Sequence, residues 1–162
     1  MNQSAPHSVD QRLRTSESMT QDRRTGARVI AVPVVLSAVV ALTAIIDQVG
    51  NYRLGAYTQA MYAPYGLQPQ PTLLYGVVYA VAVVGTVLWL LVGRAARAQR
   101  RSAPVLAIVV TTITAGLAAI LLLATEYGTA IFPPLWGILA SLPPAAGVVA
   151  VVLLLRHQQG RS

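Results

Sequence analysis

The sequence contains no cysteine and no lysine, and only five of its 162 residues are acidic. Without cysteine the chain cannot form a disulfide, a thiolate nucleophile, a Cys-ligated zinc site or a covalently attached haem. Its two histidines, His7 and His157, have no second histidine or carboxylate at ligand spacing, so we expect no metal site and no cofactor. It also lacks the short motifs of serine hydrolases, zinc proteases and phosphate-binding loops. We therefore expect no enzymatic activity.

Charge is scarce throughout the chain, because 10% of the residues are charged and 55% are apolar, whereas a soluble domain has about 25% charged residues. Four long apolar runs account for this, at about residues 29–47, 72–92, 104–125 and 131–155. At ~1.5 Å per residue, each run can cross the ~30 Å hydrocarbon core of a bilayer as a helix. The first run is longer than the apolar core of a signal peptide, so we expect it to be retained as a span. The sequence predicts an all-α integral membrane four-helix bundle over residues 29–156.

The arginines predict the orientation of this bundle. Eleven of the twelve fall in the N-terminal tail, in the link between the second and third spans, and in the C-terminal tail, which share one side after four crossings. The twelfth, Arg53, lies in an opposite loop. Because cytoplasmic loops are enriched in Arg and Lys, we expect a multi-pass protein of the inner (plasma) membrane with both termini cytoplasmic. The arginines flank spans instead of forming one basic face, so the net charge of +7 does not indicate a nucleic-acid partner.

The two ends of the chain are predicted to be tails. Residues 1–28 are rich in Ser, Thr, Gln and Arg and nearly free of large apolar side chains. Such a segment buries too little surface to offset the entropy of ordering. We therefore predict a disordered cytoplasmic tail at residues 1–28 and a short second cytoplasmic tail at residues 157–162. The long tail could serve docking or phosphorylation, or it could be a solvated leader that only fixes orientation.

The loop between the first and second spans is predicted to hold a short interfacial helix. Its large side chains recur at i, i+3, i+7, i+8 and i+11 and so share one helix face. They are Leu54, Tyr57, Met61, Tyr62 and Tyr65. On a helix in the headgroup layer, the three tyrosines would be interfacial anchors, and Trp89 would anchor the second span in the other leaflet. The loop could cover a cavity or bind a partner, or it could merely join and anchor two helix ends.

Two adjacent prolines, Pro143 and Pro144, interrupt the fourth apolar run. Each removes a backbone donor and clashes with the carbonyl four residues earlier, so we expect a kink or break near Ser141. The freed carbonyls would need a partner at membrane depth, such as the Ser141 hydroxyl, a neighbouring helix or water. Transporters place ion or substrate sites at such breaks, whereas most proline kinks only shape a helix.

Only two acidic residues lie near the membrane, Asp47 at the end of the first span and Glu126 at the end of the third. Both spans end on the outer side, where Arg53 is the only cation, so Asp47, Arg53 and Glu126 are predicted to form a small polar cluster. Two carboxylates with one arginine could bind a cation, carry a proton or fix the bundle geometry. The alternative is a pair of partly wet interfacial carboxylates that close helix ends.

Residues 66–147 carry several short motifs rich in glycine, proline and aromatic residues. They are Gly66-Leu67-Gln68-Pro69, Leu74-Tyr75-Gly76, Glu126-Tyr127-Gly128, Pro133-Pro134-Leu135-Trp136-Gly137 and Leu142-Pro143-Pro144-Ala145-Ala146-Gly147. Over about residues 64–156 the sequence resembles small four-span membrane proteins of actinobacteria that have no assigned function. The resemblance implies a four-span fold and no particular activity. The four-span small multidrug exporters differ, because they carry a functional Glu inside the first span, where this chain has Asp47 at its end.

Two function classes remain from the sequence. The first is a non-enzymatic integral membrane protein, an accessory or scaffold subunit of the cell envelope, with the outer loop and the cytoplasmic tail as contact surfaces. The second is a small transporter or channel component that uses Asp47, Glu126 and Arg53 together with the broken fourth span. The expected partners are the lipid bilayer and, as open alternatives, another membrane protein or a second copy of this chain.

Overall fold

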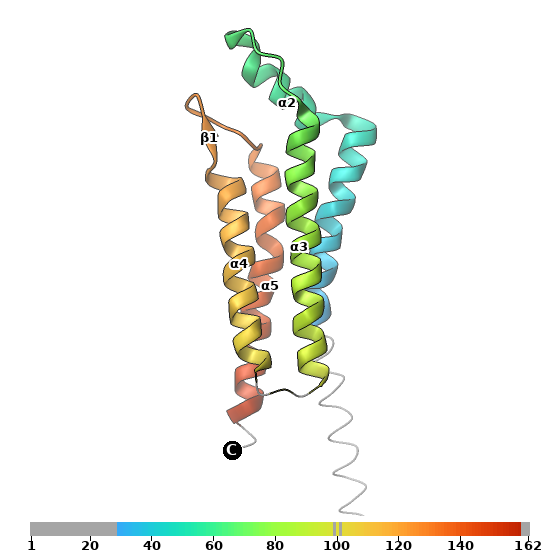
Figure 1. Ribbon diagram of the computed structural model, residues 1–162, viewed down its shortest axis with the longest axis vertical. Coiled ribbons are helices and arrows are strands. Elements are labelled where there is room, and N and C mark those ends of the chain that lie inside the picture. The colour runs from blue at the N-terminus through green and yellow to red at the C-terminus, as the bar shows by residue number, and fades with distance from the viewer. Residues whose placement is uncertain (1–28, 99, 101, 160–162) are drawn as a thin grey trace, which may run out of the picture.

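Four long helices stand side by side and a short helix crosses one end of them in the computed structural model, which describes residues 29–98, 100 and 102–159 (Figure 1). The long helices are the first helix, Val29–Asn51, followed by α3 (Pro71–Arg97), α4 (Ala103–Leu123) and α5 (Pro134–Gln159). All four are long and apolar enough to cross a membrane. The predicted all-α four-helix bundle is confirmed, and the chain has the architecture of a multi-pass membrane protein.

The predicted tails are only partly covered by the structure. The segment at residues 1–28, expected to be disordered, lies outside the described residues, as do residues 160–162. The predicted C-terminal tail starts at residue 157, but α5 continues as a helix to Gln159.

The first helix does not end in a regular α-helical turn. It closes with a π-helical turn, Asp47–Asn51, in which the Tyr52 N–H donates to the Asp47 carbonyl at 2.6 Å. Tyr52 has a φ of 50°, in the left-handed region, and this reverses the chain into α2, Arg53–Tyr62. A 3-10 turn, Ala63–Tyr65, follows α2 and ends at Gly66, whose φ of 64° suits glycine.

A small β-hairpin joins α4 to α5, and it was not predicted from the sequence. Its strands are β1, Thr125–Glu126, and β2, Thr129–Ala130, linked by a two-residue turn in which Tyr127 and Gly128 both have positive φ. This is the primed turn geometry that matches the twist of paired strands. Both neighbouring spans are shorter at this end than expected: α4 ends at Leu123 and not at residue 125, and α5 begins at Pro134 and not at residue 131. We use the name cap for α2, the 3-10 turn Ala63–Tyr65 and this hairpin, which lie at the same end of the bundle (Figure 1).

Of the predicted kink or break in the fourth span, a break does not occur, because helix α5 continues through Pro143 and Pro144. Proline's fixed φ is itself helical, although each ring removes a backbone donor and crowds the carbonyl four residues earlier. The Ser141 hydroxyl donates to the Ile138 carbonyl at 2.7 Å, one turn before the prolines. The carbonyls that the prolines deprive of a donor therefore do not gain one from Ser141.

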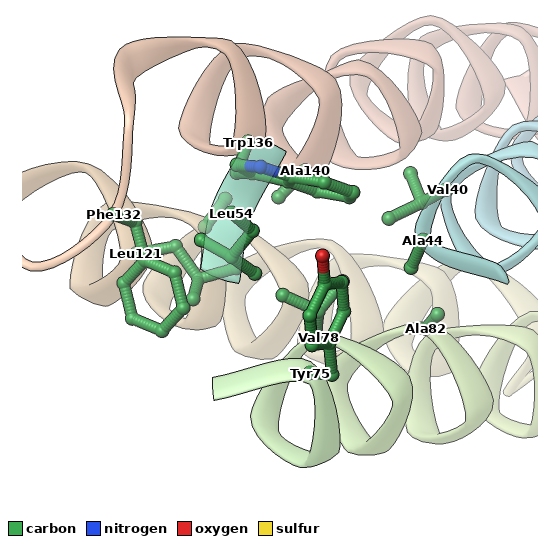
Figure 2. Close-up of a cluster of buried hydrophobic side chains, with 11 residues drawn as sticks. Val40, Ala44, Leu54, Tyr75, Val78, Ala82, Leu121, Phe132, Trp136 and Ala140 are labelled. Carbon is green, nitrogen blue, oxygen red and sulfur yellow. The ribbon is translucent and has the colours of Figure 1, made fainter. Parts of the chain in front are cut away.

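The interior of the bundle consists of two apolar clusters, one below the cap and one near the opposite end. The cluster below the cap is centred on Leu54, Tyr75, Leu121, Phe132 and Trp136. Figure 2 shows Leu54 of α2 directed into the same space as side chains from α3, α4 and α5. In the most apolar part of each long helix, only 28–33% of the residues are buried. Each helix thus packs along one face and leaves an apolar surface for lipid or for another protein.

Glycines on α5 set how closely the helices approach. A Cβ at Gly137 would lie 2.3 Å from Leu122 of α4, and a Cβ at Gly147 would lie 2.4 Å from the Trp89 ring of α3. Close approach at small residues is the usual basis of helix packing in membranes.

Candidate functional site

Asp47 is the centre of the polar structure at the cap end, and it is only 8% exposed. Its Oδ1 accepts a hydrogen bond from the Arg53 backbone N–H at 3.1 Å. Its Oδ2 accepts two more, from the Leu54 N–H at 3.0 Å and from the Tyr75 hydroxyl at 2.6 Å. One carboxylate therefore joins the end of the first helix, the start of α2 and the first turns of α3.

The way α2 begins explains why a carboxylate is needed here. The first N–H groups of any helix have no partner within it. The residue before α2, Tyr52, supplies no side-chain cap. Asp47 provides the acceptor from six residues upstream, and its negative charge also interacts favourably with the positive end of the helix dipole. Asp47 thus acts as a remote cap for α2.

Glu126 forms the second polar contact of the cap, at the other end of α2. It is half-buried on β1 and accepts a hydrogen bond from the hydroxyl of Tyr62, the last residue of α2. This bond, together with partial burial and the charge of the carboxylate, raises the pKa of Tyr62 to about 12. The Tyr62 hydroxyl therefore remains a donor at every physiological pH.

Two further tyrosines fasten α2 and its 3-10 turn to the hairpin. The Tyr57 hydroxyl donates to the Ala130 carbonyl of β2 at 2.7 Å. The Tyr65 ring stacks on the ring of Tyr127, with 4.3 Å between centroids and 24° between planes. The Tyr62 ring meets the same Tyr127 ring edge to face, at a centroid distance of 6.2 Å. With the Tyr62–Glu126 bond, these contacts make the cap one connected unit.

The structure separates the residues that were predicted to form one cluster. Asp47 lies at the start of α2 and Glu126 at its end, and a helix of ten residues is ~15 Å long. Arg53 does meet Asp47, but through its backbone N–H, while its side chain is exposed. The predicted cluster is therefore two contacts, one at each end of α2.

The residues predicted as interfacial anchors make contacts inside the protein. Helix α2 buries Leu54, Thr58 and Met61 against the bundle, whereas its tyrosines point along a neighbouring face toward the hairpin. Trp89 is not at a surface, since it is 0% exposed within the cluster opposite the cap. The reason is Gly147, which leaves room for the indole ring between α3 and α5. Within the described part of the chain the indole Nε1–H has no hydrogen-bond acceptor.

Two contributors to the site were missed by sequence reasoning. Tyr75 holds Asp47, and Tyr79, one turn further along α3, donates to the Gln48 side chain at 2.6 Å. The sequence pattern that could have identified them is their spacing, which places both tyrosines on one face of the second span. Their polar tips require partners at that depth, and the end of the first span supplies them.

No metal centre is evident in the described ranges, because no group of three or more His, Asp or Glu side chains comes together there. What the arrangement provides is a rigid, internally bonded cap on an apolar bundle. Comparison of the chain with protein-family models, with curated proteins and with solved structures yields no match.

Proposed function

We propose that this chain is a non-enzymatic membrane scaffold, an accessory subunit of the cell envelope that presents its cap to another envelope protein. In this proposal both termini are cytoplasmic, in keeping with the arginine distribution, and the cap faces outward. The four apolar helices hold the cap at the membrane surface.

The observation that carries this proposal is the internal use of both carboxylates. Each oxygen of Asp47 accepts at least one hydrogen bond from the chain itself, and Glu126 accepts one from Tyr62. A carboxylate that transports an ion or a proton must exchange partners during its cycle. Asp47 instead fixes the start of α2 against two membrane helices, which is a structural task.

The outer surface of the cap supports a role in contact. Tyr65 and Tyr127 are stacked on one another and are 49% and 52% exposed. Tyrosine is enriched at protein interfaces because its ring contributes a large contact area with few torsions to fix. The stack is already held by the hydrogen bonds of Tyr57 and Tyr62, so binding would not have to order it.

A photoreactive residue in place of Tyr65 tests the proposal in intact cells. We expect it to form one discrete protein adduct, and we expect Tyr127→Asn to weaken that adduct by removing the stacked ring. Asparagine is chosen because it tolerates the positive φ of residue 127. The same photoreactive residue in place of Val105, which is exposed on α4, is the matched control. Labelling at position 65 that equals the labelling at position 105 would contradict the proposal.

The transport alternative predicts a different result. If Asp47 or Glu126 carries an ion, Asp47→Asn or Glu126→Gln should abolish flux in proteoliposomes while the fold is retained. The scaffold proposal predicts no flux that depends on either carboxylate. Deleting the loop at residues 51–66 would be a less specific test than these point variants, because the deletion would remove Leu54 and Thr58 from the core.

A further inference from the structure

A small cavity of about 20 Å³ lies among the four long helices. Its lining residues are Ser37, Val40, Val81, Ala82, Gly85, Thr114, Ala140, Pro143 and Pro144. Ser37, Gly85, Thr114 and the two prolines are each near the middle of their own helix. The cavity is therefore at the depth furthest from water on either side of the bilayer.

Two buried hydroxyl oxygens border this cavity. A Cβ at Gly85 would lie 3.3 Å from Ser37 Oγ and 4.0 Å from the Thr114 methyl group, so both side chains converge on α3 at this point. Ser37 donates its proton to the Pro33 carbonyl at 2.9 Å, and Thr114 donates its proton to the Val110 carbonyl at 2.8 Å. Because both protons are used within their own helices, the lone pairs of the two oxygens are left to accept hydrogen bonds.

The backbone of α5 adds a third acceptor. Pro144 has no N–H, so the Ala140 carbonyl four residues earlier loses its normal helical partner. Ala140 and Pro144 both line the cavity. The nearest hydroxyl on α5, that of Ser141, donates to Ile138 instead. An unpaired carbonyl at membrane depth is unfavourable, because no solvent is present to compensate it.

We propose that this cavity binds one water molecule, which donates one hydrogen bond to the Ala140 carbonyl and one to the hydroxyl oxygen of Ser37 or Thr114. A water needs roughly 10–15 Å³ of such space and two to four polar partners, and the cavity provides both. Water supplies two donors to a site that contains only acceptors. No carboxylate lines the cavity, so a cation there would bring an uncompensated charge to the centre of the membrane.

The bound water replaces the hydrogen bond that Pro144 removes, and it connects α5 to the first helix or to α4. It thereby compensates the Ala140 carbonyl where α5 continues past Pro144. It also assigns a role to the hydroxyls of Ser37 and Thr114, which otherwise bond only to their own helices.

Filling the cavity tests the proposal, because a wet and a dry cavity respond with opposite sign. Gly85→Ala places a methyl group into it. If the cavity is dry, this variant should stabilise the protein, since alanine favours a helix and fills a void. If it holds the proposed water, the Ala140 carbonyl loses its partner, and the unfolding equilibrium constant in mixed micelles should rise roughly tenfold.

Gly76→Ala on the same helix is the matched control, because a Cβ there meets nothing within 4 Å. A Gly85→Ala protein as stable as the Gly76→Ala protein would overturn the proposal.

A second variant separates loss of water from steric overlap with Ser37. Pro144→Ala restores the N–H that the Ala140 carbonyl lacks, so the water is no longer required. In that background Gly85→Ala should change the unfolding constant by less than about twofold. A tenfold effect that persists there would mean overlap and would overturn the proposal.

Solid-state NMR of the full chain in bilayers provides a direct readout that does not depend on how well the variants fold. Magnetisation should transfer from water to Ser37 or Thr114 and not to the lipid-facing Thr112, which has the same kind of hydrogen bond to its own helix as Thr114. An absence of transfer to both Ser37 and Thr114 in the unaltered protein would overturn the proposal. So would a stability that depends on Na⁺ concentration, since it would assign the cavity to a cation.

Discussion

The cap and the long helices below it are held together by different kinds of interaction. In the cap, side chains from one element bond to another: Asp47 to α2 and α3, and Tyr57 and Tyr62 to the hairpin. Inside the long helices, seven serine and threonine hydroxyls donate to carbonyls of their own helix. Away from the cap end the long helices meet through apolar packing at small residues, whereas next to the cap Tyr79 of α3 donates to Gln48 of the first helix.

The difference follows from where backbone groups lack partners. Helix ends and turns leave N–H and C=O groups unpaired, and at the cap end of the bundle the ends of the long helices lie beside the turns and helix ends of the cap. Within a long helix the backbone is already paired, so packing alone decides which helices touch. Hydrogen bonds between elements are therefore concentrated where the chain changes direction. Small residues are concentrated where the long helices cross.

The largest destabilisation is expected when the carboxylate of Asp47 is removed, because it holds α2 to the first helix and to α3. Asp47→Ala leaves the Tyr75 hydroxyl and two N–H groups of α2 without their acceptor. We expect a loss of about 3–5 kcal/mol in the free energy of unfolding, since hydrogen bonds to a charged group are worth about 1.5–3 kcal/mol each and are not additive. Unfolding in mixed micelles measures this loss.

The control for Asp47→Ala is Arg53→Gln, which alters an exposed side chain and keeps the backbone N–H that Asp47 uses. We expect this control to remain within about 0.5 kcal/mol of the unaltered protein. An equal loss in both variants would mean that the Arg53 charge, and not the capping of α2, is what Asp47 requires.

Close packing between the long helices is tested at Gly147, near the end of the bundle opposite the cap. A Cβ at Gly147 would lie 2.4 Å from Trp89 Cζ2 and 2.9 Å from Thr111 Oγ1. The indole is rigid and fully buried, so it cannot turn aside. We expect Gly147→Ala to reduce the free energy of unfolding by about 3 kcal/mol, at the upper end of the range for overpacking.

Gly116→Ala on α4 is the corresponding control, because a Cβ at Gly116 has no neighbour within 4 Å. It should be neutral or slightly stabilising, since alanine is the better helix former. Tryptophan fluorescence during unfolding reports on both variants. If Gly147→Ala were as stable as Gly116→Ala, close packing at Trp89 would not be a determinant of this end of the bundle.

Two tyrosine variants sharpen the comparison within the cap itself. Tyr75→Phe removes a donor to Asp47 in a buried setting and should cost about 2 kcal/mol, as expected for a hydrogen bond to a charged group. Tyr62→Phe removes a donor to Glu126 in a half-buried setting and should cost less than about 1 kcal/mol, because water can replace the lost partner. Unfolding midpoints of the two variants, measured side by side, check the order. A reversed order would mean that the hairpin contact, and not Asp47, dominates the cap.

The sequence was sufficient to predict the four long helices, because a charge-free apolar run of that length has few alternatives. It also predicted a short helix where α2 lies, although the predicted face runs on to Tyr65, three residues past the end of α2. It pointed to both acids, which accept the hydrogen bonds at the two ends of α2. These predictions rest on local patterns, which need no knowledge of neighbouring elements.

The contacts between elements were not predictable in the same way. The sequence correctly predicted that Tyr57, Tyr62 and Tyr65 lie on the same side of the segment. It did not predict that this side faces a β-hairpin, because the hairpin has no recognisable sequence motif. The turn residue Tyr127 has positive φ, where Asn, Asp or Gly would be the usual indication. Trp89 was predicted to anchor the second span at a membrane surface, whereas Gly147, 58 positions away in the sequence, leaves room for it in the interior.

The smallest expected effect is a change in how Tyr62 titrates, and it tests whether the two ends of α2 are held independently. The Tyr62 hydroxyl can donate to Glu126 only while it is protonated, and its pKa of about 12 lies above the ordinary value of 10. Its contribution to stability is therefore complete below pH 10 and is lost as the pH rises through about 12.

Subtracting the tyrosinate absorbance of Tyr62→Phe from that of the unaltered chain isolates the titration of Tyr62. We expect the difference curve to be centred near pH 12 and to move toward pH 10 when Glu126→Gln is introduced. It should not move in Arg53→Gln, which alters only the other end of α2. A shift of equal size in both backgrounds would show that the two contacts are coupled through the helix, and the cap would then respond as one unit to a change at either end.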